Sequence, residues 1–274
     1  MPQIPCKEIA QKIINSLRLL PAPKKTLAAV LVKGNSASAS FIKQKDKVAA
    51  ELGINFCAYE LPENISQGEL VQKVNGLVAE ESIGGIIIQL PLPEQLNSQE
   101  ILNLIPAEKD VDVLGEQALK NFSAGQNKIL PPPVGVVKEI FKTYNLKPKT
   151  LKMAIIGTGR LVGKPISVWL ENKTAKLSIL NSKTKNIKEE LKDADIIISG
   201  AGKANLFSVD DIKENAIVID FGYSTVEGKI SGDFNPNSPI PQSSNSLTYT
   251  PTPGGTGPIL VAKIMENFYN LNNE

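Results

Sequence analysis

Residues 154–165 read Ala-Ile-Ile-Gly-Thr-Gly-Arg-Leu-Val-Gly-Lys-Pro, and this stretch decides the fold that the sequence predicts. An aliphatic run leads into Gly157 and Gly159, and a helical pattern over Leu161–Leu170 contains a third glycine, Gly163. Glycines let backbone amides approach a pyrophosphate, and the amino end of the helix carries about half a positive charge toward it. The third glycine comes one residue later than in the common dinucleotide-binding motif, and a plain tight turn is the alternative. The candidate nucleotide-binding residues are Gly157, Thr158, Gly159 and Arg160.

Strand and helix patterns alternate on both sides of this stretch. Strands are expected over Leu27–Val32, Ile54–Leu61, Gly85–Leu90, Leu151–Ile156, Lys176–Leu180, Asp195–Ser199 and Ala216–Asp220. Helices are expected over Ser38–Leu52, Ser66–Glu80, Val134–Tyr144, Leu161–Leu170, Ile187–Leu191 and Pro258–Tyr269. Continuous apolar strands separated by helices are typical of parallel sheets covered on both faces. The proline-rich segment Pro91–Asp112 is expected to cross a sheet edge, and the Ser-, Asn- and Pro-rich stretch Asn235–Asn245 to form a loop.

The pattern divides into two α/β domains. Residues 1–140 are expected to form an N-terminal substrate domain and residues 141–255 a Rossmann-type NADP-binding domain. The second series of strands and helices, which begins near Pro131, is a βαβ series typical of dinucleotide binding. The C-terminal residues 256–274, with their helix, are expected to pack back on the first domain.

Composition excludes several functional classes. The 274 residues carry a net charge of +2, so nothing favours nucleic acid as a partner. The longest apolar run, Ile83–Leu92, is broken by glycine and proline and is too short to span a bilayer, so no membrane partner is expected. The amino terminus lacks an apolar leader, and the only cysteines are Cys6 and Cys57. Both features favour a cytoplasmic protein.

The chain contains no histidine. This absence excludes a Ser-His-Asp triad and removes the usual zinc ligand and the commonest general base. Acid–base chemistry near neutral pH then needs a lysine, a carboxylate, a tyrosine or a cysteine with a shifted pKa. We expect no bound metal.

The end of the second strand of the predicted nucleotide domain indicates which dinucleotide binds. An NAD-binding domain usually carries an acidic residue there, to hold the ribose hydroxyls. Here the sequence reads Leu-Asn-Ser-Lys over 180–183, without an acid. Ser182, Lys183 and Arg160 would hold the 2′-phosphate of NADP, which a carboxylate would repel. The alternative is that Lys183 and Arg160 are ordinary charges exposed to solvent. Arg160 is one of only two arginines in the chain, and its place in this loop favours NADP binding.

A lysine interrupts the apolar stripe of the helix over Ser38–Leu52. Phe41, Lys45, Val48 and Leu52 share one side of a helix with 3.6 residues per turn. A lysine held on such a stripe loses water, which lowers its pKa toward the range that is useful for proton transfer. Taken alone, the pattern favours a lysine that only extends its charged end to solvent.

Three further segments carry polar or turn residues at strand ends. Gln89 ends the apolar strand 85–90, where ligands of open α/β sheets bind or where a loop is capped. Asp110 and Asp112 alternate with valines, which would place both carboxylates on one side of an extended segment or in a solvated loop. Residues 250–258, Thr-Pro-Thr-Pro-Gly-Gly-Thr-Gly-Pro, predict a rigid turn near a ligand or a domain linker.

Together these segments resemble the bifunctional methylenetetrahydrofolate dehydrogenase/cyclohydrolase family over nearly the whole chain. The most specific motifs are residues 85–93, Gly-Ile-Ile-Ile-Gln-Leu-Pro-Leu-Pro, residues 109–112, Lys-Asp-Val-Asp, and residues 253–258, Pro-Gly-Gly-Thr-Gly-Pro. The resemblance implies oxidation of 5,10-methylenetetrahydrofolate with NADP and hydrolysis of the methenyl product to 10-formyltetrahydrofolate. It also implies homodimers, tetrahydrofolate derivatives as substrates, and a place in the one-carbon metabolism that serves purine biosynthesis.

The resemblance also implies roles for individual residues. Lys45 matches the catalytic lysine of the family. Gln89 matches the glutamine that makes a hydrogen bond to that lysine and adjusts its reactivity, and Asp112 matches the aspartate that binds the pterin ring. Ser182 matches the 2′-phosphate site and Tyr223 a position that lines the cofactor pocket. The implied substrate-binding residues are Phe41, Pro253, Gly254 and Gly255.

Several positions depart from the family pattern. Phe41 stands where a tyrosine is usual, so a hydroxyl group is missing beside the substrate. Val113-Leu114 stands where a glycine and an aromatic residue or leucine are usual, and residues 131–133 are three prolines where Cys-Thr-Pro is common. Three alternatives therefore remain: a dehydrogenase with weak or lost cyclohydrolase, a non-catalytic NADP- or folate-binding relative, and another two-domain dehydrogenase related to shikimate dehydrogenase. The last does not explain the motifs at 85–93 and 253–258.

Overall fold

The structure is a computed structural model that describes residues 1–237 and 247–273. Its contacts divide the chain into two compact units, and the expected two-part α/β architecture is confirmed. Gln11–Pro132 and Val261–Glu274 form one, which we call the three-stranded unit. Met1–Ala10 and Pro133–Leu260 form the other, the five-stranded unit. Residues 238–245 of the predicted loop lie outside the described residues.

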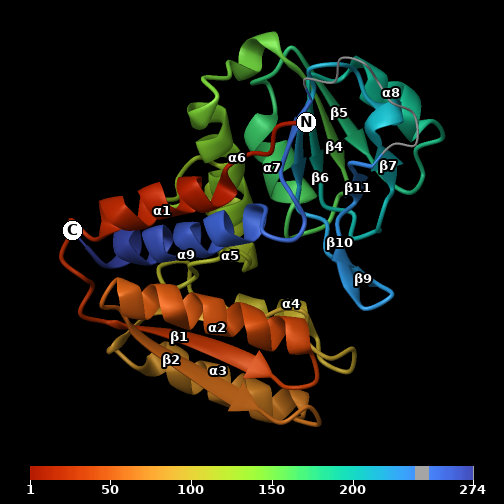
Figure 1. Ribbon diagram of the computed structural model, residues 1–274. Helices are drawn as coiled ribbons and strands as arrows, with labels where there is room; N and C mark the ends of the chain where they lie inside the picture. The colour runs from red at the N-terminus through yellow and green to blue at the C-terminus, as the bar shows by residue number, and fades with distance from the viewer. Residues whose placement is uncertain (238–246, 274) are drawn as a thin grey trace. The chain divides into compact units, whose positions relative to one another are not determined.

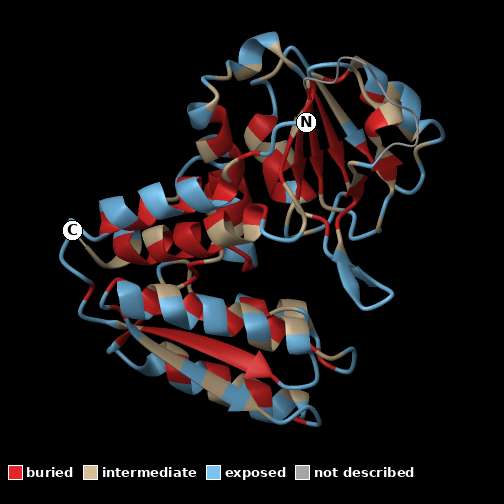
Figure 2. Cartoon of the chain, in the orientation of Figure 1, coloured by how far each residue is buried: buried red, intermediate tan, exposed pale blue. Residues whose placement is uncertain are grey.

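The three-stranded unit is built on a parallel sheet. Its strands are β1 (Thr26–Val32), β2 (Asn55–Leu61) and β3 (Ile83–Ile88), in the order β2-β1-β3. Helices α2 (Ser36–Glu51) and α3 (Gln67–Ala79) cover opposite faces of this sheet (Figure 1). Figure 2 shows β1 buried along almost its whole length, as a central strand between two helical layers requires.

Local signals set the limits of these two helices. The side chain of Asn35 accepts the backbone N–H of Ser38 at the start of α2, and Gly53, at φ +69°, follows its end. Ser66 and Glu69 form a capping box at the start of α3. Both helices therefore begin and end within two residues of the predicted limits.

The C-terminal helix α9 (Thr256–Asn272) packs on the three-stranded unit through its last turns, as expected. The Tyr269 hydroxyl donates to the carbonyl oxygen of Leu52 over 3.3 Å, and the Asn272 amide donates to that of Gly84 over 3.0 Å. A Cβ atom at Gly85 would lie only 2.8 Å from the ring of Phe268. Glycine in β3 therefore lets this helix approach the sheet closely.

The five-stranded unit has the doubly wound topology of nucleotide-binding sheets. Its parallel strands are β4 (Lys152–Ile156), β5 (Lys176–Leu180), β6 (Ile196–Ser199), β8 (Ile217–Asp220) and β12 (Thr248–Tyr249). Their order is β12-β8-β6-β4-β5, so the chain reverses direction across the sheet between β4 and β6. Ligands of such sheets bind at the carboxyl ends of the strands at this reversal. Residue Gln3 forms a parallel bridge to Tyr249 beside β12.

Helices and short strands complete this unit. The helices are α6 (Pro132–Thr143), α7 (Gly163–Leu170) and α8 (Ile187–Asp193), with 3-10 turns η1 (Pro148–Thr150) and η2 (Val209–Asp211). Short strands β7 (Phe207–Ser208) and β11 (Phe234–Asn235) pair in parallel, and β9 (Ser224–Val226) and β10 (Lys229–Ser231) form an antiparallel hairpin. Ala154 and Ile156 of β4 pack with Leu191 of α8 in one apolar cluster.

The units part between residues 132 and 133, whereas we expected a boundary between residues 140 and 141. Helix α6 runs through the expected position and stays whole, because Val137 and Ile140 are fully buried and Phe141 packs on Trp169 with ring centroids 6.1 Å apart. Residues 1–10 also belong to the five-stranded unit. The division of the two functions between residues 1–140 and 141–255 stays a prediction.

Three helices lie where the sequence analysis assigns none. They are α1 (Cys6–Leu17), α4 (Ser98–Asn103) and α5 (Glu116–Ser123). Helix α1 buries Cys6, Ile9, Ala10, Ile13, Ile14 and Leu17. That spacing is helical and would have predicted α1. Helix α4 interrupts the segment that we expected only to cross the sheet edge, and the side chain of Asn97 caps its amino end.

Candidate functional sites

Lys45 is buried and makes a hydrogen bond to Gln89. The lysine is only 4% exposed, and its Nζ atom donates to Oε1 of Gln89 over 2.9 Å. Gln89 directly follows β3, and its backbone N–H donates to the carbonyl oxygen of Val30 in β1. Its Nε2 atom donates to the carbonyl oxygen of Leu90 over 2.8 Å, which fixes the orientation of the amide. The structure therefore brings together two predicted residues that are 44 positions apart in the chain.

The apolar stripe of α2 is rotated slightly from the predicted one. Phe41 and Val48 are half-buried, whereas Ser38, Ile42, Lys45 and Ala49 are the buried residues of the helix. Lys45 therefore lies on the buried face, as predicted, but with Ile42 and Ala49 as its buried neighbours instead of Phe41 and Val48. The lysine does not extend its charged end to solvent, so the ordinary interpretation of this pattern is wrong here.

Burial and a neighbouring carboxylate act in opposite directions on Lys45. Loss of water lowers the pKa of the ammonium group, and the charge of Asp112 raises it in part. The pKa of Asp112 is itself raised by burial and lowered in part by Lys45. The net effect keeps more of Lys45 neutral near pH 7 than an exposed lysine would be. A neutral amine can accept a proton from water.

Asp112 lies in a turn and not in an extended segment. Residues 111 and 112 form the turn, and Val113 has a left-handed φ of +54°. The carboxylate of Asp110 accepts the backbone N–H groups of Leu114 and Gly115 at the start of α5, over 2.9 and 2.8 Å. The two aspartates therefore have separate tasks: Asp110 shapes the turn, and Asp112 interacts with Lys45. The extended alternative was wrong because the chain turns at residues 111 and 112, where the N–H of Val113 donates to the carbonyl oxygen of Asp110 over 3.2 Å.

Phe41 lies one turn before Lys45 on α2. The Nζ atom of Lys45 is 5.6 Å from the centroid of the Phe41 ring, so the ring face contributes a weak attraction for the cation. A half-buried phenyl ring also offers an apolar surface on which a flat ligand can stack. It offers no hydroxyl group for a hydrogen bond.

The glycine-rich loop has the close backbone approach that a dinucleotide site needs. Gly157 has a φ of +95°, and its N–H donates to the carbonyl oxygen of Leu180 over 2.8 Å. A Cβ atom at Gly163 would lie 1.8 Å from the carbonyl oxygen of Gly157. Only glycine at position 163 lets α7 begin directly against the loop. Thr158 and Gly159 are exposed at the carboxyl end of β4, on the side of the sheet reversal where a nucleotide binds.

The residues predicted to bind the 2′-phosphate, Ser182 and Lys183, follow strand β5, which lies next to β4. Ile156 of β4 pairs with Leu180 of β5, so the loops after both strands leave the sheet side by side. The second loop is a turn in which the Asn181 side chain accepts the N–H of Lys183 over 2.8 Å. Ser182 and Lys183 are exposed in this turn. Their place at the end of the second strand is the one that the sequence predicted.

The remaining predicted residues are more scattered. Arg160 is half-buried in the glycine-rich loop, and Tyr223 is 53% exposed just before β9. Pro253, Gly254 and Gly255 belong to the five-stranded unit, in the turn before α9. Lys45, Gln89, Asp112 and Phe41 all belong to the three-stranded unit. The assignment of the turn residues 253–255 to the substrate stays a prediction.

A buried polar network that the sequence analysis did not single out orders a third loop of the five-stranded unit. The fully buried Asp233 accepts hydrogen bonds from the Ser199 hydroxyl and from the N–H groups of Ala201 and Lys203, each over 2.6–2.7 Å. Its neighbour Asp220 accepts the N–H groups of Gly222 and Phe234, and burial raises its pKa to about 7. Ser199 and Asp220 each end a buried strand, and such polar strand ends are the signal that would have found this network.

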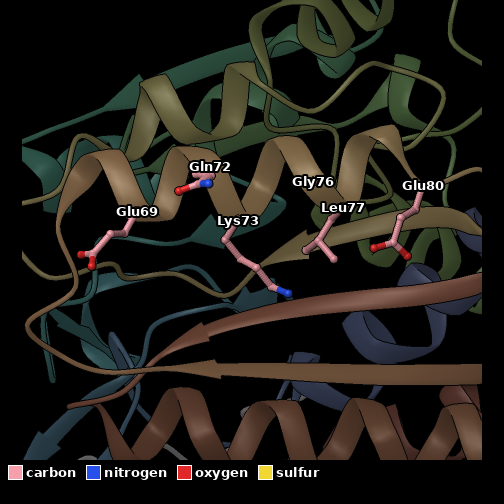
Figure 3. A pocket seen from close by; sticks show the side chains of 6 residues that line it. All are labelled: Glu69, Gln72, Lys73, Gly76, Leu77 and Glu80. Atoms are coloured by element: carbon pink, nitrogen blue, oxygen red, sulfur yellow. The ribbon is translucent and has the colours of Figure 1, made fainter.

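A surface hollow of about 360 Å³ lies along α3 of the three-stranded unit, and none of the predicted site residues lines it (Figure 3). Its lining residues are Glu69, Gln72, Lys73, Gly76, Leu77 and Glu80. They come from α3 and the residue that follows it, so no second element contributes converging polar groups. The Nζ atom of Lys73 lies 3.9 Å from the centroid of the Tyr59 ring. We assign no function to this hollow.

Across residues 1–237 and 247–273, no three side chains of metal-binding type are grouped so that they would hold an ion. Within the same ranges, no helix combines the length and the apolar character needed to cross a membrane.

The fold and the sites define an α/β protein with one dinucleotide-binding unit and one unit that carries a buried Lys–Gln pair. Comparison with known families identifies the family within this class. The family model described as tetrahydrofolate dehydrogenase/cyclohydrolase, catalytic domain, matches residues 4–112, and that for the NAD(P)-binding domain matches residues 131–274. The chain belongs to the tetrahydrofolate dehydrogenase/cyclohydrolase family, and the resemblance inferred from its motifs is confirmed.

Individual relatives are similar to this chain over almost its full length. The chain is 34% identical over 264 residues to the bifunctional protein FolD 2 of Lactobacillus johnsonii, which covers 96% of this chain and 93% of that protein. It is 33% identical, with a TM-score of 0.89, to the bifunctional FolD methylenetetrahydrofolate dehydrogenase/cyclohydrolase of Campylobacter jejuni, over 99% and 98% of the two chains. The Trypanosoma brucei enzyme, solved with NADP cofactor and an inhibitor, is 26% identical with a TM-score of 0.89 over the same shares.

Proposed function

We propose that this protein oxidises 5,10-methylenetetrahydrofolate with NADP and hydrolyses the resulting 5,10-methenyltetrahydrofolate to 10-formyltetrahydrofolate. One observation carries the proposal: in a member of this family, Lys45 is buried, bonded to Gln89 and adjacent to the charge of Asp112. A buried lysine with a lowered pKa is costly to maintain in a fold, and a binding protein would not need one.

The hydrolysis step uses the two protonation states of Lys45. Neutral Lys45 accepts a proton from the water that attacks the methenyl carbon. The ammonium group so formed then returns a proton to the ring nitrogen as its bond to that carbon breaks. The hydroxyl proton of the carbinol passes to solvent water as the C=O bond forms, which leaves the formyl group on the other nitrogen. Gln89 holds the Nζ atom in place through its 2.9 Å hydrogen bond. The carboxylate of Asp112 accepts hydrogen bonds from the pterin ring, and the ring of Phe41 stacks against the substrate.

The five-stranded unit supplies the cofactor site. NADP, when bound, accepts the hydride from the methylene carbon. The close contact between Gly163 and Gly157 fits a pyrophosphate at the amino end of α7, and Gly157, Thr158 and Gly159 contribute backbone N–H groups. Arg160 and Ser182 bind the 2′-phosphate, and Tyr223 lines the pocket. Pro253, Gly254 and Gly255 contact the substrate from the turn before α9.

The proposal extends to assembly and location. We place the folate chemistry in residues 1–140, with 256–274, and the cofactor site in residues 141–255. The protein acts as a homodimer in the cytoplasm, without nucleic-acid or membrane partners. Its product, 10-formyltetrahydrofolate, is a one-carbon donor of the kind that purine biosynthesis consumes.

A second candidate function is a dehydrogenase with weak cyclohydrolase activity. Phe41 favours it, because a hydroxyl group that this family usually presents to the substrate is absent. Without that hydroxyl, one hydrogen bond that helps to place the substrate or the attacking water is lost, at a cost of about 0.5–1.5 kcal/mol. Such a loss slows hydrolysis and leaves hydride transfer in place.

One assay tests both candidates. The protein is mixed with 5,10-methylenetetrahydrofolate and either NADP or NAD, and reduced cofactor and methenyl product are followed together by absorbance. The bifunctional enzyme gives reduced cofactor with NADP and little with NAD. Its methenyl product stays well below the amount of reduced cofactor, because the enzyme hydrolyses it. Methenyl product that accumulates as fast as reduced cofactor indicates the second candidate. A folded protein that turns over neither cofactor contradicts both.

The pH dependence of hydrolysis is expected to report the charge of Asp112. Because the base must be neutral, the rate rises with pH through the pKa of Lys45. Asp112 raises that pKa, so Asp112→Asn is expected to move the rising limb of kcat/KM to lower pH, and to raise KM as well. The rate is measured from pH 5 to 9 after subtraction of uncatalysed hydrolysis. Asp46→Asn, which removes an exposed carboxylate from the same helix, is the control. An unmoved limb in Asp112→Asn would contradict the assignment of Lys45 as the base.

A further inference from the structure

The turn that carries Asp112 is held by hydrogen bonds from several directions. Its first residue, Lys109, accepts the N–H of Ile86 in β3 over 2.8 Å. The ammonium group of Lys109 donates to the carbonyl oxygens of Val78 and Glu80 at the end of α3, over 2.8 and 2.9 Å. At the other end of the turn, Asp110 accepts the N–H groups that begin α5. Both ends of the segment 109–115 are therefore fixed to the three-stranded unit.

The middle of the turn is fixed by a residue of the C-terminal helix. Asn267, on α9, is 4% exposed, and its Nδ2 atom donates to the carbonyl oxygens of Val111 and Leu130, each over 2.8 Å. An amide has two N–H groups, so this one is fully used in joining residue 111 to residue 130. Val111 is the residue directly before Asp112. The bond of Asn267 therefore acts on the peptide unit that joins Val111 to Asp112, whose charge acts on Lys45.

The turn needs this support because it is strained. Val113 is a β-branched residue with φ +54°, a region that such side chains rarely adopt. A strained backbone persists only where the surrounding contacts hold it. Without the bond to Val111, the peptide units around Asp112 can relax toward ordinary φ values, and this movement takes the carboxylate away from Lys45.

We propose that Asn267 is a positioning residue for the folate site: its amide fastens the turn 109–115 to α9 and keeps the Asp112 carboxylate beside Lys45. This inference rests on the proposed function of Lys45 and Asp112. It assigns to the C-terminal helix a task beyond packing. Asn267 touches neither substrate nor cofactor in this role, and it acts through the backbone of Val111.

The chain provides a matched control on the same helix. Asn272 also donates two hydrogen bonds from its Nδ2 atom, to the carbonyl oxygens of Gly84 and Phe268 over 3.0 and 2.9 Å. These partners lie at the start of β3 and in α9 itself, and not in the turn 109–115. Asn267→Ala and Asn272→Ala therefore each remove a bridging amide from α9, and only the first releases the turn.

The test compares the two variants with the wild type in the full chain. Asn267→Ala is expected to raise KM for 5,10-methylenetetrahydrofolate by about tenfold, the effect of losing roughly one good hydrogen bond. KM for NADP is expected to change by less than about twofold, and Asn272→Ala to change neither by more than that. A merely structural role would affect both substrates alike. Equal increases in the two KM values, or equal effects of the two variants, would overturn the proposal.

A second measurement does not depend on activity. Hydrogen exchange at the backbone amides of Leu114 and Gly115, which are bonded to Asp110, reports the order of the turn. Exchange there is expected to accelerate at least about tenfold in Asn267→Ala and to stay unchanged in Asn272→Ala. If Asn267→Ala does not fold, Asn267→Ser, which keeps one donor, takes its place. Unchanged exchange overturns the role of Asn267, whereas a wild type that does not turn over folate overturns only the proposed function.

Discussion

Replacing Lys45 with methionine is expected to lower the rate of methenyltetrahydrofolate hydrolysis by about a hundredfold or more, the usual contribution of general acid–base catalysis. Methionine keeps the length of the side chain and removes its nitrogen. Among the described residues, no other amine is bonded to Gln89, so no group there remains to take the proton from water. Hydrolysis is followed as the loss of methenyl absorbance, corrected for the uncatalysed reaction.

The same substitution has a mixed effect on stability. It removes a buried ammonium group, which favours the fold, and leaves the carboxylate of Asp112 without its cation, which opposes the fold. Folding is therefore checked by circular dichroism before any rate is compared. Lys43→Met and Lys47→Met serve as controls, because both lysines are exposed on the same helix. Full hydrolysis by a folded Lys45→Met enzyme, or an equal loss in the controls, would exclude Lys45 as the catalytic base.

Much of the fold could be predicted because its signals are local. The central strands β1, β3 and β6 are largely apolar runs, and Ser66 with Glu69 marks the start of α3 as a capping box. Gly53, at φ +69°, marks the end of α2. Each of these features needs only neighbouring residues. Helix α5 lacks such a marker: its N-cap is Gly115, which makes no side-chain bond, and the N–H of Glu116 donates instead to the side chain of Asn103, 13 residues away in the chain.

The candidate site was predicted residue by residue, and the bond between Lys45 and Gln89 was predicted only because the family resemblance implies it. The pairing of Lys45 with Gln89 depends on β3 lying beside β1, and strand order is not written in either segment. For Asp112 the sequence left an extended segment and a loop open, since nothing in it shows that the chain turns at residues 111 and 112. Asn267 was missed for a related reason. Its partners are the backbone carbonyls of residues 111 and 130. Every residue has a backbone carbonyl, so the amino-acid sequence does not indicate which ones accept a hydrogen bond.

The glycine-rich loop leads to the second large expected effect, Gly163→Ala. A Cβ atom at this position would lie 1.8 Å from the carbonyl oxygen of Gly157 and 2.7 Å from its carbonyl carbon, so the loop or the start of α7 must move. Both atoms belong to the backbone, and no side chain can yield instead. We expect NADP affinity to fall at least about tenfold, because the loop loses the approach of its N–H groups to the pyrophosphate.

Two comparisons separate this effect from general damage. At Gly159 a Cβ atom would meet no atom within 4 Å, so Gly159→Ala is expected to keep the melting temperature of the wild type, while Gly163→Ala lowers it. Hydrolysis of methenyltetrahydrofolate consumes no cofactor, and the proposed function assigns it to Lys45 and Gln89, which belong to the three-stranded unit. Gly163→Ala is therefore expected to lose the NADP-dependent oxidation and to retain most of the hydrolysis. NADP affinity is measured by titration calorimetry. If Gly163→Ala binds NADP as tightly as the wild type, the backbone contact at Gly157 does not shape the cofactor site. If it loses both activities together, the variant is unfolded.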